Sequence, residues 1–160
     1  MTTKSPPDIT VFDIADWFLV QAKEENIPLE HMKLQKLVYF AYGWYCAFRD
    51  YSPPLFEEDI FVWRRGVIVK QLYKEYIRFG DNPIEIVGLQ APDLHVNVIE
   101  ILEAVWKSYS HISSSLLDSA IHKHSAWRKA QRSSEWDAVM SPESIKETFK
   151  KLIDQYEHAH

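Results

Sequence analysis

The feature that most constrains this chain is the run Leu37–Phe48, which contains no charged residue. It lies in a segment over residues 30–50 that suits a helix, and a helix that is apolar on every side has no face for water. Such a helix is expected either at the centre of a fold or beneath a bound partner, and the sequence leaves both arrangements open. No uninterrupted apolar run approaches the roughly 18 residues of a membrane span.

The chain has 160 residues, of which 46% are hydrophobic and 26% charged. This length suits one domain, and the composition excludes extensive disorder. We expect residues 1–8 to form a flexible tail and residues 9–157 to form the domain. The single cysteine, Cys46, excludes an internal disulfide and favours a reducing compartment, where a thiol in so apolar a segment is expected to be buried. The N-terminus lacks the apolar stretch of a signal peptide, so we expect a cytoplasmic protein.

Helix signals recur along the chain. Thr10 is a predicted N-cap, with Asp13 three residues later, for a helix that ends near Asn26. Ser141 followed by Pro142 is typical of the start of a last helix. Between them we expect helices over residues 30–50, 69–80, 93–109 and 114–124. The alternation at residues 84–86 suggests a short strand that pairs with residues 60–63. The predicted fold class is therefore mainly α: one compact helical domain of about six helices with a small two-stranded β element.

No recognisable catalytic motif is present. The closest two of the four glycines are eight positions apart, which excludes a phosphate-binding P-loop and a dinucleotide fingerprint. A helix would point His122 and His124 about 200° apart, so they could not share a metal ion. We expect no enzyme activity, no cofactor and no metal. A hydrolase or nuclease site around His122 and Lys123 is a minor alternative that no residue spacing supports.

The formal net charge of −5 disfavours general nucleic-acid binding, since phosphate affinity depends on Lys and Arg. Two basic clusters nevertheless occur, over residues 64–78 and 123–132. We interpret them as solvated helix faces, with a cationic binding patch as the alternative. The alternative gains weight because Trp63 and Trp127 lie beside the clusters, and Trp with Arg often anchors protein interfaces. The cluster residues are Arg64, Arg65, Lys70, Lys74, Arg78, Lys123, Arg128, Lys129 and Arg132.

Three blocks of sequence resemble the Panacea-domain family of SocA-like antitoxins, also described as phage-associated GepA-like proteins. The first is Met-Lys-Leu-Gln-Lys-Leu-Val-Tyr-Phe-Ala-Tyr-Gly-Trp over residues 32–44. The second, over residues 55–73, resembles the family's Trp-x-x-Gly-Pro-Val-x-Pro-x-Leu-Tyr stretch, and the third, over residues 117–130, its Leu…Thr-His…Pro-Trp-x-x-Ala block. The blocks follow the family's order. This chain departs from the family pattern at Val67, Lys70, Ile121 and Ala126.

The resemblance implies a mostly helical antitoxin that neutralises a cognate toxin, usually encoded beside it, by direct protein binding. The alternative is a phage or mobile-element accessory protein that binds a host or phage factor without a toxin partner. We expect no membrane partner, because no apolar run is long enough to span a membrane, and the net charge makes a nucleic-acid partner unlikely. Homo-oligomer formation stays open.

Ten residues of the blocks are candidates for partner binding or for the family motif. Aromatic residues at helical spacing usually face inward, so Lys33, Lys36 and Arg64 are the better surface candidates. The ten are Lys33, Gln35, Lys36, Tyr39, Tyr42, Trp63, Arg64, Tyr73, His122 and Trp127.

Overall fold

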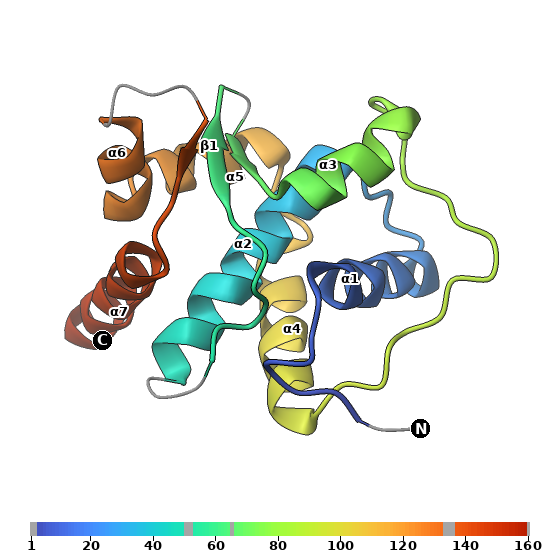
Figure 1. Cartoon of the computed structure of the whole chain (residues 1–160), viewed down its shortest axis with the longest axis horizontal. Coiled ribbons are helices and arrows are strands. Elements are labelled where there is room, and N and C mark those ends of the chain that lie inside the picture. Colours follow the sequence, from blue (N-terminus) through green and yellow to red (C-terminus); the bar gives the residue numbers. More distant parts are fainter. Residues whose placement is uncertain (1–2, 50–52, 65, 133–136, 160) are drawn as a thin grey trace.

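The computed structural model describes residues 3–49, 53–64, 66–132 and 137–159 (Figure 1). Its helices are α1 (Val11–Glu25), α2 (His31–Phe48), α3 (Lys70–Tyr76), α4 (Val96–Tyr109), α5 (Ser114–His122), α6 (Ser125–Gln131) and α7 (Pro142–Ala159), with a 3-10 turn η1 (Ile77–Phe79) after α3. The strands are β1 (Phe61–Trp63), β2 (Gly66–Ile68) and β3 (Ala138–Val139). The expected mainly α fold is confirmed. The structure also contains helix α6, which the sequence did not predict as a separate helix.

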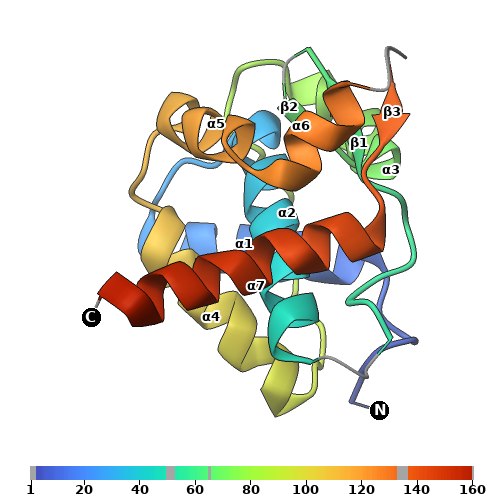
Figure 2. The ribbon, with the colours of Figure 1, turned by 90° about the vertical axis from the view of Figure 1, so that its left-hand side faces the viewer.

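The central helix is α2. In Figure 1 it runs through the middle of the molecule, with α1, α3 and α4 on one side and α6 and α7 on the other. Figure 2 shows α7 crossing over it. Leu34, Leu37 and Val38 are fully buried, and the chain's own helices cover the run that lacks charge. A partner is therefore not needed to cover this run, and that alternative was wrong. Phe48, the last residue of the helix, is exposed.

The crossing of α2 and α7 depends on the absence of a side chain at Gly43. The ring of Phe149 in α7 occupies the space where a Cβ of residue 43 would lie. Phe149 is fully buried and also contacts the rings of Tyr39 and Trp44 in edge-to-face geometry. Close packing at this point lets the two longest helices approach each other.

The predicted helix ends are confirmed at both extremes of the domain. The Thr10 side chain accepts a hydrogen bond from the Asp13 backbone N–H, and the Asp13 side chain accepts one from the Thr10 backbone, so both groups of a capping box are present. Helix α7 begins at Pro142, as expected, and the Ser141 hydroxyl accepts a hydrogen bond from Ser144 N. Helix α4 begins at Val96 rather than near residue 93, because Asp93 and His95 form backbone hydrogen bonds with Lys4.

The sheet has the order β2-β1-β3, with both pairs antiparallel. β1 pairs with β2, whose first residue Gly66 adopts a φ of 124°, and with β3 from far along the chain. The predicted strand over residues 84–86 was wrong. That segment is a loop in which Ile84 N donates to Leu29 O, and its alternation reflects partly buried Ile84 and Ile86 around exposed Glu85. Among the described residues, no helix is long and apolar enough to cross a membrane.

Candidate functional site

Gln35 of the first block joins α2 to the end of the β1–β2 hairpin. Its side chain is 2% exposed, and its Oε1 accepts from Val69 N at 2.8 Å while its Nε2 donates to Val69 O at 3.1 Å. Val69 follows β2 and is the N-cap of α3, and its carbonyl also accepts the first helical hydrogen bond, from Tyr73 N at 3.1 Å. The Gln35 amide pairs with both peptide groups of Val69, so it holds the start of α3 against α2.

Lys36 lies in the interior, with 1% of its side chain exposed, so the expectation that it would be a surface residue was wrong. Its Nζ donates to Met32 O at 3.2 Å and lies 3.3 Å from Oδ1 of Asp118 in α5. A Cβ on Gly66 would lie 3.0 Å from the same Asp118 oxygen. The ammonium group therefore connects residues of all three sequence blocks.

Tyr39 forms the third connection of α2. Its hydroxyl lies 2.8 Å from Nδ1 of His124, which precedes α6, and both residues are buried. Burial lowers the pKa of His124 to about 4, so the ring is neutral near pH 7. Burial also raises the pKa of the Tyr39 hydroxyl, which therefore keeps its proton for this hydrogen bond.

The remaining candidates of the first block also have internal partners. Tyr42 is buried, and its ring lies 4.9 Å from that of Phe56. Lys33 is half-buried, and its Nζ donates to Ser110 O while burial lowers its pKa. Burial raises the pKa of Cys46 to about 11, which makes its thiol unreactive near neutral pH and agrees with the expected buried cysteine.

The third block contributes one buried and one exposed candidate. Trp127 of α6 is 4% exposed, and the His122 ring lies 4.5 Å from it at an angle of 30°. His122 is exposed at the end of α5, whereas His124 is buried, so the two histidines face different surroundings. Over the described ranges, no group of three or more His, Cys, Asp and Glu residues could hold a metal ion.

Trp63, Arg64 and Tyr73 of the second block lie at the surface. Trp63 shares the outer face of β1 with Phe61, because alternate residues of a strand point to the same side. The Trp63 and Tyr73 rings are 5.0 Å apart at 70°, and Arg64 is exposed. We call the following set the sheet-face patch: Phe61, Trp63, Arg64, Lys70, Tyr73, Asp137 and Val139.

Asp137 holds the sheet-face patch together. One carboxylate oxygen accepts from Trp63 Nε1 at 2.5 Å and the other from Lys70 Nζ at 2.7 Å. These two hydrogen bonds lower the pKa of the Asp137 carboxyl, so it is ionised at neutral pH. The Lys70 ammonium also lies 3.9 Å from the centre of the Phe61 ring. The aromatic residues of the patch are therefore fixed before any partner arrives.

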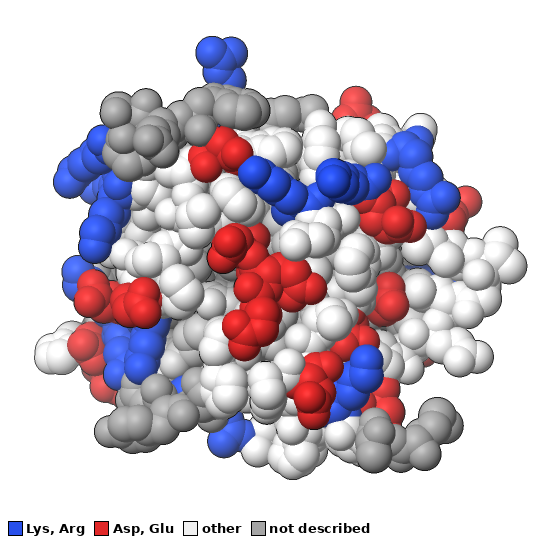
Figure 3. Space-filling view, viewed as in Figure 1, with Lys and Arg blue, Asp and Glu red and all other residues white. Residues whose placement is uncertain are grey.

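Sequence reasoning missed part of this patch. Lys70 was included only as a member of a basic cluster, and Phe61, Asp137 and Val139 were not singled out. Val139 pairs with Phe61 across the sheet and is 46% exposed. Figure 3 shows Lys and Arg side chains along the upper part of this face, over α3 and the sheet, with acidic side chains below them. Arg65 lies outside the described residues.

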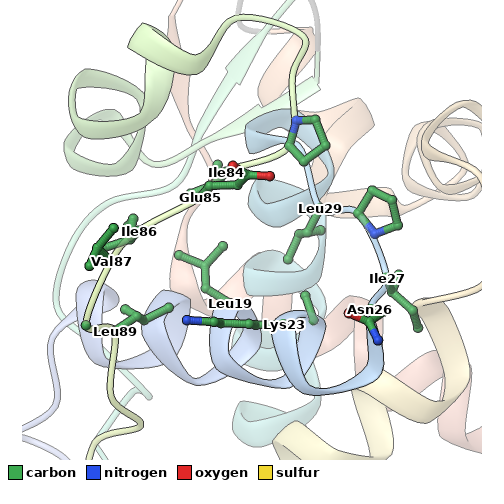
Figure 4. Close-up of a pocket in the computed structure, with 14 residues that line it drawn as sticks. Leu19, Lys23, Asn26, Ile27, Leu29, Ile84, Glu85, Ile86, Val87 and Leu89 are labelled. Atoms are coloured by element: carbon green, nitrogen blue, oxygen red, sulfur yellow. The ribbon is translucent and has the colours of Figure 1, made fainter.

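A separate groove of about 500 Å³ lies between α1 and residues 83–89 (Figure 4). Leu19, Leu29, Ile84 and Leu89 supply apolar walls, and Lys23 lies at its rim. None of the ten candidate residues lines it. The groove therefore does not belong to the site that the three blocks define.

The architecture defines a small helical domain in which a central helix is joined to the hairpin, α5 and α6 by three buried polar side chains. The model of one family, described as "Antitoxin SocA-like, Panacea domain", matches residues 34–128, which is more than half of the chain. The chain therefore belongs to the SocA-like antitoxin, Panacea-domain family, and the resemblance of the three blocks is confirmed. Searches of curated proteins and of solved structures each found no match.

Proposed function

We propose that this protein is an antitoxin that neutralises a cognate toxin by direct binding, with the sheet-face patch as the contact surface. The proposal rests on where the side chains of the first two family blocks lie in the fold. Gln35, Lys36 and Tyr39 serve the interior of the fold, whereas Trp63, Arg64 and Tyr73 reach the surface together. A buried first block, together with a second block that brings these three side chains to the surface, suits an antitoxin that contacts its toxin through that surface.

The chemistry of the patch suits a protein partner. Trp, Tyr and Arg are the residues that most often dominate binding energy at protein interfaces. The Asp137 hydrogen bond holds Trp63 in one orientation, so little side-chain entropy is lost when a partner binds. Arg64, together with nearby exposed Lys74, adds positive charge. We therefore expect the toxin to present an apolar pocket bordered by Asp or Glu.

An enzymatic role receives no support from the perturbed titratable groups. Tyr39 and His124 have pKa values far from their ordinary ranges, a feature that often marks active sites. Both are sealed in the core, at 1% and 6% exposure, where a substrate cannot reach them. Their hydrogen bond is accounted for by the packing of α2 against the α5–α6 junction.

Co-expression with the product of the neighbouring gene tests the proposal. We expect that product to arrest growth alone, and this protein to restore growth and co-purify with it. Arg64→Glu should weaken both effects, because it reverses a charge on an exposed side chain without disturbing the core. Lys107→Glu, an equal charge change on α4, is the matched control and should rescue normally.

Two outcomes would count against the antitoxin role, and a third against the contact surface. If the neighbouring product arrests growth with or without this protein, neutralisation is contradicted. If the product is harmless alone and nothing co-purifies, the accessory-protein alternative is favoured. Rescue that Arg64→Glu leaves unchanged would keep the antitoxin role but move the contact away from the sheet-face patch.

A further inference from the structure

A second hollow lies between the α5–α6 region and α7 and has a volume of about 400 Å³. One wall is formed by α6 and its C-cap residue, at positions i, i+3, i+4 and i+7 of one helix face. The other wall is formed by α7, at positions i, i+3 and i+7. Figure 2 shows α6 lying alongside α7. The lining residues are Lys123, Ser125, Arg128, Lys129, Arg132, Ser144, Glu147 and Lys151, and we call this hollow the cationic cleft.

The cationic cleft concentrates positive charge in a protein that is acidic overall. Five of its lining residues are Lys or Arg and one is acidic, whereas the whole chain carries a formal charge of −5. Figure 3 shows Lys and Arg side chains gathered along the edge formed by α6 and α7. At physiological salt, repulsion from acidic groups more than about 8 Å away is largely screened. The electrostatic force on an anion in the cleft therefore comes mainly from these cations.

These five cations lack acidic partners in the part of the chain that the structure describes. The ion pairs there involve Lys4, Lys36, Lys70 and Arg78 instead. The guanidinium of Arg128 donates to His122 O at 3.3 Å, a neutral acceptor. Like charges that face one another across a cleft repel, and a bound anion would relieve that repulsion.

Two hydroxyl groups and a helix end add to the site. Ser144 is 6% exposed in the first turn of α7, and its Oγ accepts a hydrogen bond from Ser141 Oγ at 2.9 Å, which leaves its own hydroxyl hydrogen to donate. Ser125 Oγ lies 3.0 Å from Thr148 Oγ1 at the other wall. The first turn of an α-helix carries partial positive charge, and α7 is long enough for this to contribute.

We propose that the cationic cleft binds a small molecule that carries two or more linked phosphate groups. Five cations exceed what one phosphate needs, and a concave site encloses a compact anion. Among the described residues no aromatic side chain lines the cleft, and aromatic side chains are the stacking surface that single-stranded nucleic acid uses. The chain's overall negative charge also repels a long polyanion. The cleft shares no residue with the sheet-face patch, so this inference does not depend on the proposed function.

Calorimetric titration of the full-length protein with pyrophosphate tests this inference. We expect saturable binding at one site, weaker binding of orthophosphate, and affinity that falls as salt rises. The double variant Arg128→Glu/Lys151→Glu should lose at least about tenfold in affinity, which corresponds to about 1.4 kcal/mol. Both side chains are exposed. The control Lys23→Glu/Lys107→Glu carries the same charge change elsewhere and should bind as the unmodified protein does.

A ten-nucleotide homopolymeric RNA and a poly-glutamate peptide complete the experiment. Weaker binding of both than of pyrophosphate would support a compact phosphate site. Three results would overturn the inference: no saturable pyrophosphate binding, equal losses in the two double variants, or tighter binding of either polymer. Tighter RNA binding would indicate a nucleic-acid surface, and tighter peptide binding would indicate a protein contact. Circular dichroism of each variant separates loss of binding from loss of fold.

Discussion

Lys36 of α2 and Asp118 of α5 form an ion pair in which Nζ and Oδ1 are 3.3 Å apart. The two side chains differ in solvent access, since that of Lys36 is 1% exposed and that of Asp118 is 30% exposed. The pair connects the first and third sequence blocks, and Gly66 of the second lies against it. Loss of its partner should therefore cost the buried Lys36 ammonium more free energy than it costs the partly hydrated Asp118 carboxylate.

We predict that Asp118→Asn destabilises the fold more than Lys36→Met does. The first change leaves a buried ammonium without its counter-ion, which typically costs about 3 kcal/mol or more. The second removes the buried charge and keeps the apolar stem, and Asp118 can turn to solvent. Urea unfolding of both variants measures the difference. Equal losses, or a larger loss for Lys36→Met, would contradict this view of the pair.

Gln35→Leu should lower the free energy of unfolding by about 1–3 kcal/mol, because it leaves the Val69 N–H without a partner and removes one of the two hydrogen bonds that Val69 O accepts. Gln71 is exposed on α3, and Gln71→Leu is the matched control, with an expected change within about 0.5 kcal/mol. Thermal and urea unfolding provide the comparison. Similar stability of the two variants would show that the Gln35 hydrogen bonds contribute little.

The buried His124 should make stability depend on pH between about 6.5 and 4. The unfolded chain binds a proton at this residue below its ordinary pKa of about 6.5, whereas the folded protein does so only near 4. The contribution of His124 to the free energy of unfolding is thus fully present above pH 6.5. It falls by about 3 kcal/mol as the pH drops toward 4. His124→Gln cannot titrate, so its unfolding free energy should fall less between pH 7 and pH 4. Parallel pH profiles of the two proteins would disprove this effect.

Gly43→Ala should destabilise the protein by about 2 kcal/mol or more, although alanine favours helices, because the new methyl group meets the Phe149 ring. Combining it with Phe149→Leu should cost less than the sum of the two single changes, since the smaller side chain makes room. A double-mutant cycle in urea measures this coupling. Strict additivity would show that the two positions do not compete for space.

Sequence patterns predicted the elements whose signals are local. The Thr10 capping box and the Ser141–Pro142 start depend on residues within one turn, and both were found where expected. The α6 helix escaped prediction because it begins directly after the turn at residues 123–124, where the previous helix was expected to end. β3 has two residues, and its pairing with β1 comes from tertiary contact, which no local pattern reveals.

The candidate site shows the same limit of sequence reasoning. A lysine is rarely buried without a partner, so nothing at Lys36 itself indicates an interior position. Its partner Asp118 lies far along the chain, and only the fold brings them together. Asp137 is likewise far along the chain from Trp63 and Lys70, although the fold brings the three side chains into contact. Its φ of 78° cannot be seen in the sequence. In contrast, the exposure of Arg64 beside Trp63 agrees with what the sequence favoured.

The central claim is that this protein binds a toxin through the sheet-face patch, and the dissociation constant of the purified pair tests it most directly. Titration of the neighbouring gene product with the unmodified protein, Arg64→Glu and Lys107→Glu should give equal constants for the first and the last. Arg64→Glu should bind at least about tenfold more weakly, the loss of about 1.4 kcal/mol expected for an interface anchor. Equal constants for all three proteins, or no complex at all, would contradict the claim.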